Sequence, residues 1–158
     1  MGTAANPSGQ TPAAALRMRR AELSDAAAVR DLLGELGYPC DLGEAQDRIL
    51  HIHSSHRQSL IVAELAHTVV GMVCLDFMYY LPIGRETCRV TALVINSAHR
   101  NQQFGHALLR FAEAVARREG AARIELTTAA QRADAHRFYK ASGYADNSLR
   151  FVKNLSDA

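Results

Sequence analysis

Residues 90–120 read VTALVI, then NSAHRNQQFGH, then ALLRFAEAVARREG, and this stretch decides the fold. Its first six residues form a short, mostly apolar and β-branched run that ends at a polar Asn-Ser pair, which is typical of a strand. Farther on, Leu108, Phe111 and Val115 recur at the spacing of one helix face. Gly120 stands where such a helix ends. The stretch therefore predicts a strand, a tight polar loop and an amphipathic helix.

The loop at 96–105 joins this strand directly to the helix. The first turn of a helix leaves backbone N–H groups without acceptors and carries a partial positive charge, so it can bind an anion. The loop also supplies Arg100, and Gly105 follows at the start of the helix. An ordinary strand-to-helix connection has the same features, so these residues alone leave both interpretations open.

The pattern Arg-x-x-x-x-Gly-x-Ala-Leu-Leu after an apolar strand, here from Arg100 to Leu109, resembles the acyl-CoA pyrophosphate loop of the GNAT superfamily of N-acetyltransferases. Gln103 stands where that family usually has its first glycine, a residue suited to positive φ and to close approach of a phosphate. Its backbone N–H can still donate. The resemblance implies acetyl-CoA as cosubstrate, held by Leu93, Val94, Ile95, Arg100, Asn101, Gln102, Gln103, Phe104, Gly105, His106 and Ala107.

A second segment, from Arg132 to Tyr144, resembles the family's Asn-x-x-Ala-x-x-Phe-Tyr-x-x-x-Gly-Phe motif. Arg132 replaces the usual Asn, whereas Ala135, Phe138 and Tyr139 fit. The resemblance adds Arg132, Ala135 and Phe138 to the expected cofactor-binding residues. It makes Tyr139 the general acid and gives the oxyanion donor as a backbone N–H near Val94.

This chemistry suits a tyrosine. Aminolysis of a thioester needs a neutral amine, an oxyanion donor and a proton for the departing thiolate. A tyrosine with a pKa near ~10 stays protonated at neutral pH and can donate to a thiolate with a pKa near ~8.5. The plainer interpretation is that Phe138 and Tyr139 form the apolar side of a helix.

The general base is left open. Relatives often carry a Glu on the strand before the loop, where this chain has Thr91 and Ala92. The alternatives are a water relay or one of three carboxylates, Asp76, Glu86 and Glu125.

Other segments carry weaker signals. In the family, the acceptor side is lined by segments that here hold Tyr38, His53, Asp76, Tyr79 and Tyr80, although loop and core packing explain these residues equally well. The arginines Arg100, Arg110, Arg117, Arg118 and Arg123 are better explained by a solvated helix face than by nucleic-acid binding, because no aromatic interleaving accompanies them. The histidines His51, His53 and His56 do not share one helix face, so no metal site is predicted.

The length of 158 residues, with 48% hydrophobic and 22% charged residues and a net charge of +2, fits one globular domain. We expect a disordered leader at 1–15 and a single GNAT domain at 16–158. The cysteines Cys40, Cys74 and Cys88 form no C-x-x-C pair, which favours a reducing, cytoplasmic compartment. We expect no membrane or nucleic-acid partner, and a homodimer is left open.

The rest of the chain alternates strand and helix patterns. We expect a strand at 16–20, a helix capped by Ser24 and ended by Gly37, a second helix with a capping box at Asp41 and Glu44, and a hairpin of 60–65 with 69–77. A loop at 79–84 leads to a strand at 86–95. We then expect a parallel strand at 123–128, a helix at 134–142 and a last strand at 149–155.

This order predicts an α+β fold with a mixed central sheet, an antiparallel first half, a βαβ crossover and helices on both faces, as in the GNAT acyl-CoA N-acyltransferase fold. We expect an N-acetyltransferase that moves an acetyl group from acetyl-CoA to a primary amine by direct attack. The alternative is an acyl-CoA-binding module without catalysis. The segments 132–140 and 150–155 also resemble the aminoalkylphosphonate N-acetyltransferases, which implies a small anionic amine as acceptor.

Overall fold

The computed structural model describes residues 14–128 and 132–156, so most of the expected leader at 1–15 lies outside the described residues. The elements in chain order are β1 (Arg17–Arg20), α1 (Ala26–Leu36), α2 (Leu42–Ser54), β2 (Gln58–Leu65), β3 (Thr68–Tyr80), β4 (Arg85–Ile95), α3 (Phe104–Arg118), β5 (Arg123–Leu126) and α4 (Ala133–Ala141). Among these described helices, none is both long and apolar enough to cross a membrane.

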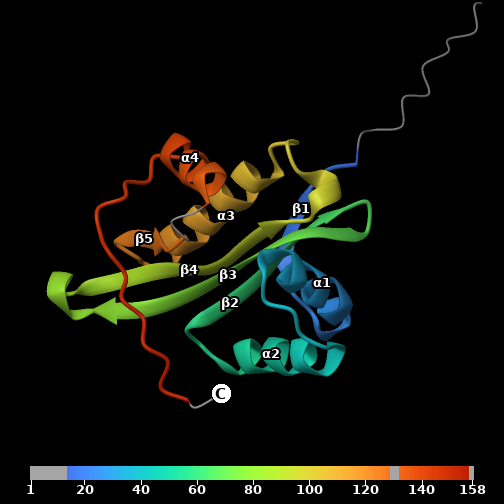
Figure 1. Cartoon of the computed structure of the whole chain (residues 1–158), viewed down its shortest axis with the longest axis horizontal. Helices are drawn as coiled ribbons and strands as arrows, with labels where there is room; N and C mark the ends of the chain where they lie inside the picture. The colour runs from blue at the N-terminus through green and yellow to red at the C-terminus, as the bar shows by residue number, and fades with distance from the viewer. Residues whose placement is uncertain (1–13, 129–131, 157–158) are drawn as a thin grey trace, which may run out of the picture.

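The five strands form one sheet in the order β1-β2-β3-β4-β5 (Figure 1). The first four strands pair antiparallel, and β5 runs parallel to β4 after the α3 crossover. The mixed sheet with an antiparallel first half and a βαβ crossover is therefore confirmed.

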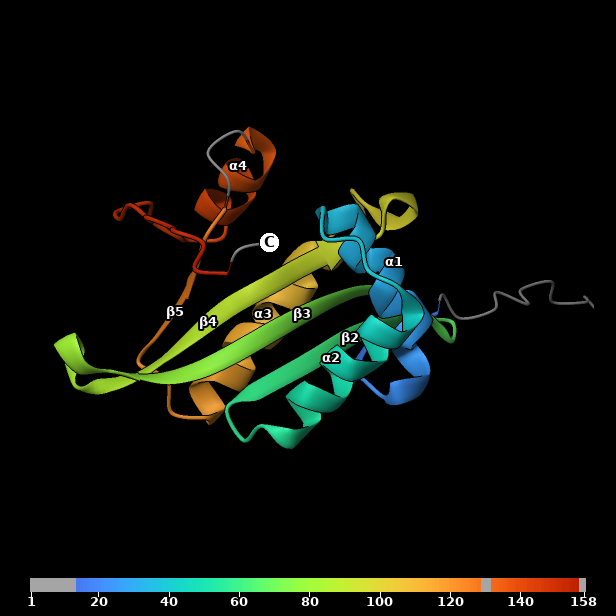
Figure 2. The ribbon, with the colours of Figure 1, turned by 60° about the horizontal axis from the view of Figure 1, so that its bottom comes forward.

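Helices cover both faces of this sheet, as Figure 2 shows. On one face α3 packs against a core that includes Val70, Val73, Leu108 and Ala112. On the other face α1 and α2 enclose Val29, Ile49, Val62 and Met72. The apolar stripes of the helices explain this two-sided burial.

Two local signals in the first half of the chain, a capping box and a hairpin turn, are confirmed. Asp41 and Glu44 form the expected capping box, in which the Asp41 carboxylate accepts from the Glu44 N–H at 2.8 Å and the Glu44 carboxylate accepts from the Asp41 N–H at 2.9 Å. The two-residue turn between β2 and β3 places Ala66 and His67 at φ values of 47° and 64°. Both positive φ values are those of a hairpin turn whose twist matches its strands.

A β-bulge interrupts β4. Ala92 opposes Cys74 and Val90 opposes Leu75, so Thr91 is an extra residue without a partner across the pair. Pairing between β4 and β5 ends at Val90, opposite Leu126. Beyond that point β5 and α4 turn away from the end of β4 (Figure 2). The sheet therefore splits open beside the last residues of β4.

Three sequence expectations are wrong. Ser24 does not cap α1, because it lies in a 3₁₀ turn and Asp25 takes the N-cap position. Asp25 instead accepts from the Glu22 N–H and from the Arg19 guanidinium, each at 2.7 Å. Tyr79 and Tyr80 do not lie in a loop, since the pairing of β3 with β4 continues until Tyr80 opposes Arg85.

The third wrong expectation is the strand at 149–155, which is irregular and exposed. Its alternating apolar residues include Phe151 and Leu155, each 91% exposed. The Arg150 guanidinium donates a hydrogen bond of 2.8 Å to the Thr127 hydroxyl, which ties the segment to the residue after β5. Alternation alone does not make a strand, because a strand also needs a partner edge to pair with its backbone.

Candidate active site

The loop after β4 contains two non-glycine residues in the left-handed region. Asn101 has a φ of 62°, and Gln103, the N-cap residue of α3, has a φ of 65° and a ψ of 9°. Gln103 thus stands in the backbone conformation that a glycine would adopt most easily. The loop keeps its turn into the helix despite the missing glycine.

A carboxylate from α1 holds this loop. Glu35 accepts from the Ser97 N–H at 2.8 Å and from the Arg100 guanidinium at 3.1 Å. Arg100 also donates from Nε to the Ile95 carbonyl at 3.2 Å. Sequence reasoning missed Glu35, because nothing in the sequence signals that it meets residues more than sixty positions away.

The first turn of α3 presents free backbone donors. The Ala107 N–H already donates to the Gln103 carbonyl at 3.1 Å, so it is not one of them. The N–H groups of Phe104, Gly105 and His106 have no acceptor within the helix. A Cβ on Gly105 would lie 3.4 Å from the Phe138 ring, so this glycine lets α4 pack against the α3 start.

The two motif segments therefore meet in space. The His106 and Phe138 rings lie 4.5 Å apart, and the Ser142 hydroxyl lies 3.2 Å from His106 Nδ1. Farther along α3, Glu113 accepts from the Tyr144 hydroxyl at 3.0 Å. These contacts fix α4 and the residues that follow it against α3.

Tyr139 lies half-buried on α4 between two other aromatic rings. Its ring centroid is 5.1 Å from that of Phe138 and 5.8 Å from that of Tyr144. Burial raises the pKa of Tyr139, although the positive charge of Arg132 opposes the rise. No residue in the described parts of the chain hydrogen-bonds the Tyr139 hydroxyl, which leaves its proton available. On the same helix, Arg132 is the exposed N-cap residue and Ala135 is half-buried.

Among the described residues, the end of β4 has one edge without a strand partner. The Asn96 N–H donates to the Val70 carbonyl on β3 at 2.8 Å. Along an antiparallel pair, every second residue directs its N–H toward the neighbouring strand. Val94 lies two residues before Asn96, so its N–H also points toward β3. Leu93 and Ile95 direct theirs to the opposite edge, where β5 has turned away.

Two of the three candidate bases are paired with arginines. Glu86 lies 3.2 Å from Arg57, and Glu125 lies 2.6 Å from Arg89 and 2.9 Å from Arg123. Asp76 is half-buried on β3 and forms no ion pair with any described residue. Alternate residues of a strand face the same side of the sheet. Asp76 follows Met72 and Cys74 at this spacing, so it lies on the sheet face covered by α1 and α2.

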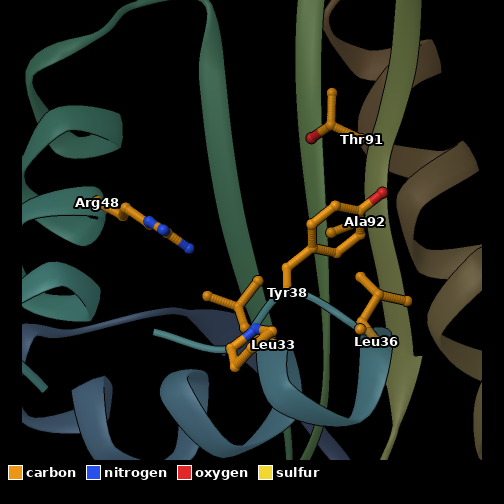
Figure 3. Close-up of a pocket in the computed structure, with 8 residues that line it drawn as sticks. Leu33, Leu36, Tyr38, Arg48, Thr91 and Ala92 are labelled. Atoms are coloured by element: carbon orange, nitrogen blue, oxygen red, sulfur yellow. The ribbon is translucent and has the colours of Figure 1, made fainter. Parts of the chain in front are cut away.

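A cavity of about 620 Å³ lies on that face, between α1, α2 and β4 (Figure 3). Its lining residues are Leu33, Leu36, Gly37, Tyr38, Pro39, Arg48, Thr91 and Ala92. The bulge directs the neighbouring side chains of Thr91 and Ala92 to the same face, and both line the cavity. Of the acceptor-side residues expected from sequence, only Tyr38 does so. The sequence analysis did not identify Arg48.

The remaining expected residues have other roles. The His53 ring bonds the Ala21 carbonyl at 2.8 Å, and the Tyr80 ring lies 4.3 Å below the Arg123 guanidinium. Across residues 14–128 and 132–156, no cluster of three or more His, Cys, Asp or Glu side chains could hold a metal ion.

This fold, with an open β4 edge leading to the N-terminus of a helix, is shared by GNAT acetyltransferases. Residues 26–144 match the acetyltransferase (GNAT) family. The chain belongs to this family.

Individual relatives agree with this assignment. The chain is 40% identical to the aminoalkylphosphonate N-acetyltransferase of Salmonella typhimurium over 87 residues, which make up 55% of this chain and 56% of the relative. It thus spans about half the length of that curated relative.

Solved structures share the fold. A transcriptional regulator from Bacillus halodurans is 25% identical with a TM-score of 0.82, and the match covers 89% of this chain and 100% of the other. A GNAT family acetyltransferase from Staphylococcus aureus is 23% identical with a TM-score of 0.78, and the match covers 89% of this chain and 98% of the other.

Proposed function

We propose that the protein transfers an acetyl group from acetyl-CoA to the primary amine of a small molecule, by direct attack and without an acyl-enzyme. One observation carries the proposal. The unpaired edge of β4 leads into the first turn of α3, whose backbone N–H groups have no acceptor, and α4, which carries Tyr139, packs against that turn through Phe138. The relative named for aminoalkylphosphonates supports a small-molecule amine as acceptor. The three free cysteines are compatible with a cytoplasmic protein.

The pyrophosphate of the cosubstrate fits the first turn of α3. The N–H groups of Phe104, Gly105 and His106 would donate to its oxygens, and Gly105 leaves room because it has no Cβ. The loop residues Asn101, Gln102 and Gln103 would border the phosphates, with Arg100 as the nearby cation. Ala107 would contribute through packing, since its N–H is already bonded within the helix.

The oxyanion donor is best assigned to Leu93. An oxyanion hole needs a donor that has no other partner and that points to the reacting carbonyl. The Val94 N–H points toward β3, so it cannot donate to a group at the open edge of β4. The Leu93 N–H faces the open edge, and the Ile95 N–H lies two residues farther along the same edge, where it can hold the amide chain of the cosubstrate.

Tyr139 would protonate the leaving group. As the amine nitrogen bonds to the acetyl carbon, the carbon–sulfur bond breaks and the thiolate takes the Tyr139 proton. A raised pKa keeps the hydroxyl protonated at neutral pH. Phe138 and Ala135 on the same helix, with Arg132 at its start, would border the cosubstrate.

The amine must lose a proton before or during attack. Glu86 and Glu125 are weaker candidates, because arginine side chains already occupy their carboxylates. Asp76, or water that carries the proton to solvent, is the better candidate. Asp76 shares the sheet face of the cavity but does not line it, so it would act on an amine held there through water.

Free thiol released from acetyl-CoA in the presence of a panel of primary amines tests this function. We expect release that depends on both the protein and the amine. Calorimetry with CoA separates the alternatives: binding without turnover on any amine would favour the acyl-CoA-binding module. Absence of binding at ~1 mM CoA, which corresponds to only about 4 kcal/mol, would exclude the cosubstrate itself.

A further inference from the structure

The cavity beside β4 has polar and apolar wall surface in about equal parts, and one charged side chain. Leu33, Leu36, Pro39 and Ala92 supply apolar surface, and Arg48 is the charged residue among the eight described residues that line it. None of these eight residues has a carboxylate, so the net charge of the lining side chains is positive. A ligand in this space meets a positive charge, apolar side chains and the polar groups of Tyr38 and Thr91.

Arg48 starts from a fixed part of α2, and its side chain is exposed and forms no ion pair with the described residues. It lies on α2 between the fully buried Ala45 and Ile49, which fix this side of the helix against the core. Figure 3 shows Arg48 extending from α2 toward the Tyr38 ring, with Thr91 and Ala92 on the strand beyond. No ion pair or hydrogen bond joins Arg48 to any residue in the described parts of the chain.

An unpaired guanidinium next to apolar surface is well suited to bind a compact anion. Its N–H groups form a rigid fork that matches two oxygens of a phosphonate, phosphate or carboxylate. A neighbouring carboxylate would compete for that fork, as Glu35 does for Arg100. No carboxylate in the described parts of the chain pairs with Arg48, because Glu44, one turn earlier on α2, accepts from the Asp41 N–H instead.

The opposite wall of the cavity leads to the proposed reaction centre. Thr91 and Ala92 line the cavity and directly precede Leu93, whose N–H we assign as the oxyanion donor. A short molecule in the cavity can therefore direct one end to Arg48 and the other to the end of β4. An acceptor with an amine at one end and an anion at the other fits this arrangement.

We propose that Arg48 recognises the anionic group of the acceptor, so that the preferred substrates are short amines bearing a phosphonate, phosphate or carboxylate. This inference rests on the proposed function, because it takes the cavity as the acceptor site. Arg48 sets specificity and does not take part in the chemical step.

The kinetic test compares 2-aminoethylphosphonate, β-alanine and propylamine in the wild type and in Arg48→Gln. Removing a charged hydrogen-bond partner lowers affinity by roughly tenfold to a hundredfold. In Arg48→Gln we expect KM for the two anionic amines to rise by roughly tenfold to a hundredfold. The kcat/KM for propylamine should stay the same within about twofold. Arg48→Lys keeps the charge but not the fork, and it should restore part of the loss. Whichever anionic amine has the higher wild-type kcat/KM identifies the favoured anion.

Arg30→Gln is the matched control, since Arg30 lies on α1, pairs with Asp31 and does not line the cavity. It should leave all three amines unaffected. Equal losses for propylamine and the anionic amines in Arg48→Gln would overturn the inference, as would a wild type that does not prefer the anionic amines.

A binding experiment keeps the inference testable if no amine is acetylated. Ethylphosphonate, which carries the anion without the amine, is titrated into each protein in the presence of CoA, and the amide signals are followed by NMR. We expect shifts at residues 33–39 and 91–92 in the wild type and in Arg30→Gln, and none in Arg48→Gln. Equal binding to all three proteins, or none to the wild type, would contradict the role of Arg48. Failure of the proposed catalysis would instead appear as absent turnover with ethylphosphonate binding intact.

Discussion

The Arg100 guanidinium lies 3.1 Å from the Glu35 carboxylate and ties the loop before α3 to helix α1. The same carboxylate accepts from the Ser97 N–H, so both ends of the short 3₁₀ turn at Ser97–His99 are held by one side chain. Because Leu33 and Leu36 of α1 also line the cavity, one helix borders both the loop and the proposed acceptor site.

Glu35→Gln should tighten CoA binding. The amide keeps an acceptor for the Ser97 N–H, whereas the lost negative charge leaves Arg100 free to attract the pyrophosphate. The two side chains are 53% and 30% exposed, so the effect is at most about 1 kcal/mol, or roughly fivefold in the dissociation constant. Calorimetry measures it, with Glu119→Gln at the end of α3 as the control. Weaker CoA binding in Glu35→Gln would show that its charge serves to order the loop.

Gln103→Gly should stabilise the protein. A side chain in the left-handed region costs about 1–2 kcal/mol, part of which returns as extra freedom of glycine in the unfolded chain, so we expect a net gain of about 0.5–1 kcal/mol. Gln102 is its matched neighbour, with no positive φ, and Gln102→Gly should destabilise. Urea unfolding measures both. Equal stabilities of the two variants would contradict the role assigned to the Gln103 backbone.

Tyr139→Phe should lower kcat by about 10²–10⁴-fold while CoA affinity stays the same, because only the proton donor is lost. An acid acts in its protonated form, and burial raises the pKa of Tyr139 above its usual value of 10.0. The fall in wild-type activity caused by ionisation of Tyr139 should therefore lie above pH 10. Tyr144→Phe, which removes the neighbouring hydroxyl, should change kcat less than tenfold. Undiminished turnover in Tyr139→Phe would exclude this acid.

Gly71→Ala should destabilise the sheet next to the site. A Cβ at Gly71 would clash with Ile95 Cδ1 and lie 2.9 Å from the Val94 carbonyl. Overpacking of this kind costs about 1–3 kcal/mol. Gly34 lies at an exposed position of α1, and a Cβ there would have nothing within 4 Å. Gly34→Ala should therefore stabilise the protein by about 1 kcal/mol. Thermal unfolding compares the two, and a Gly71→Ala variant as stable as the wild type would refute the close approach of β3 and β4.

Much of the fold could be predicted because its signals are local. The capping box at Asp41, the Ala66–His67 turn and the helix end at Gly120 each depend on a few neighbouring residues. The strand expected at 149–155 failed because strand formation depends on a partner edge, which alternation does not reveal. Strand β3 is longer than expected because β4 continues to pair with Tyr79 and Tyr80.

The candidate site could be predicted only where a motif marks it. Arg100, Gly105 and Phe138 lie in two recognisable segments, and the structure brings these segments together. Glu35 and Arg48 lie on helices whose local pattern indicates only exposed polar faces, so their positions near the loop and the cavity follow from tertiary packing. The choice of Leu93 over Val94 needed the register of β3 against β4.

Mass spectrometry of a quenched reaction tests the central claim most directly, with acetyl-CoA, 2-aminoethylphosphonate and the wild-type protein. Direct transfer predicts N-acetylated amine that accumulates with time and a protein whose mass does not change. An acetyl group that forms on the protein and later appears on the amine would contradict direct attack. A protein that binds acetyl-CoA but acetylates neither this amine nor any amine of the thiol-release assay would contradict the proposed acetyltransferase activity.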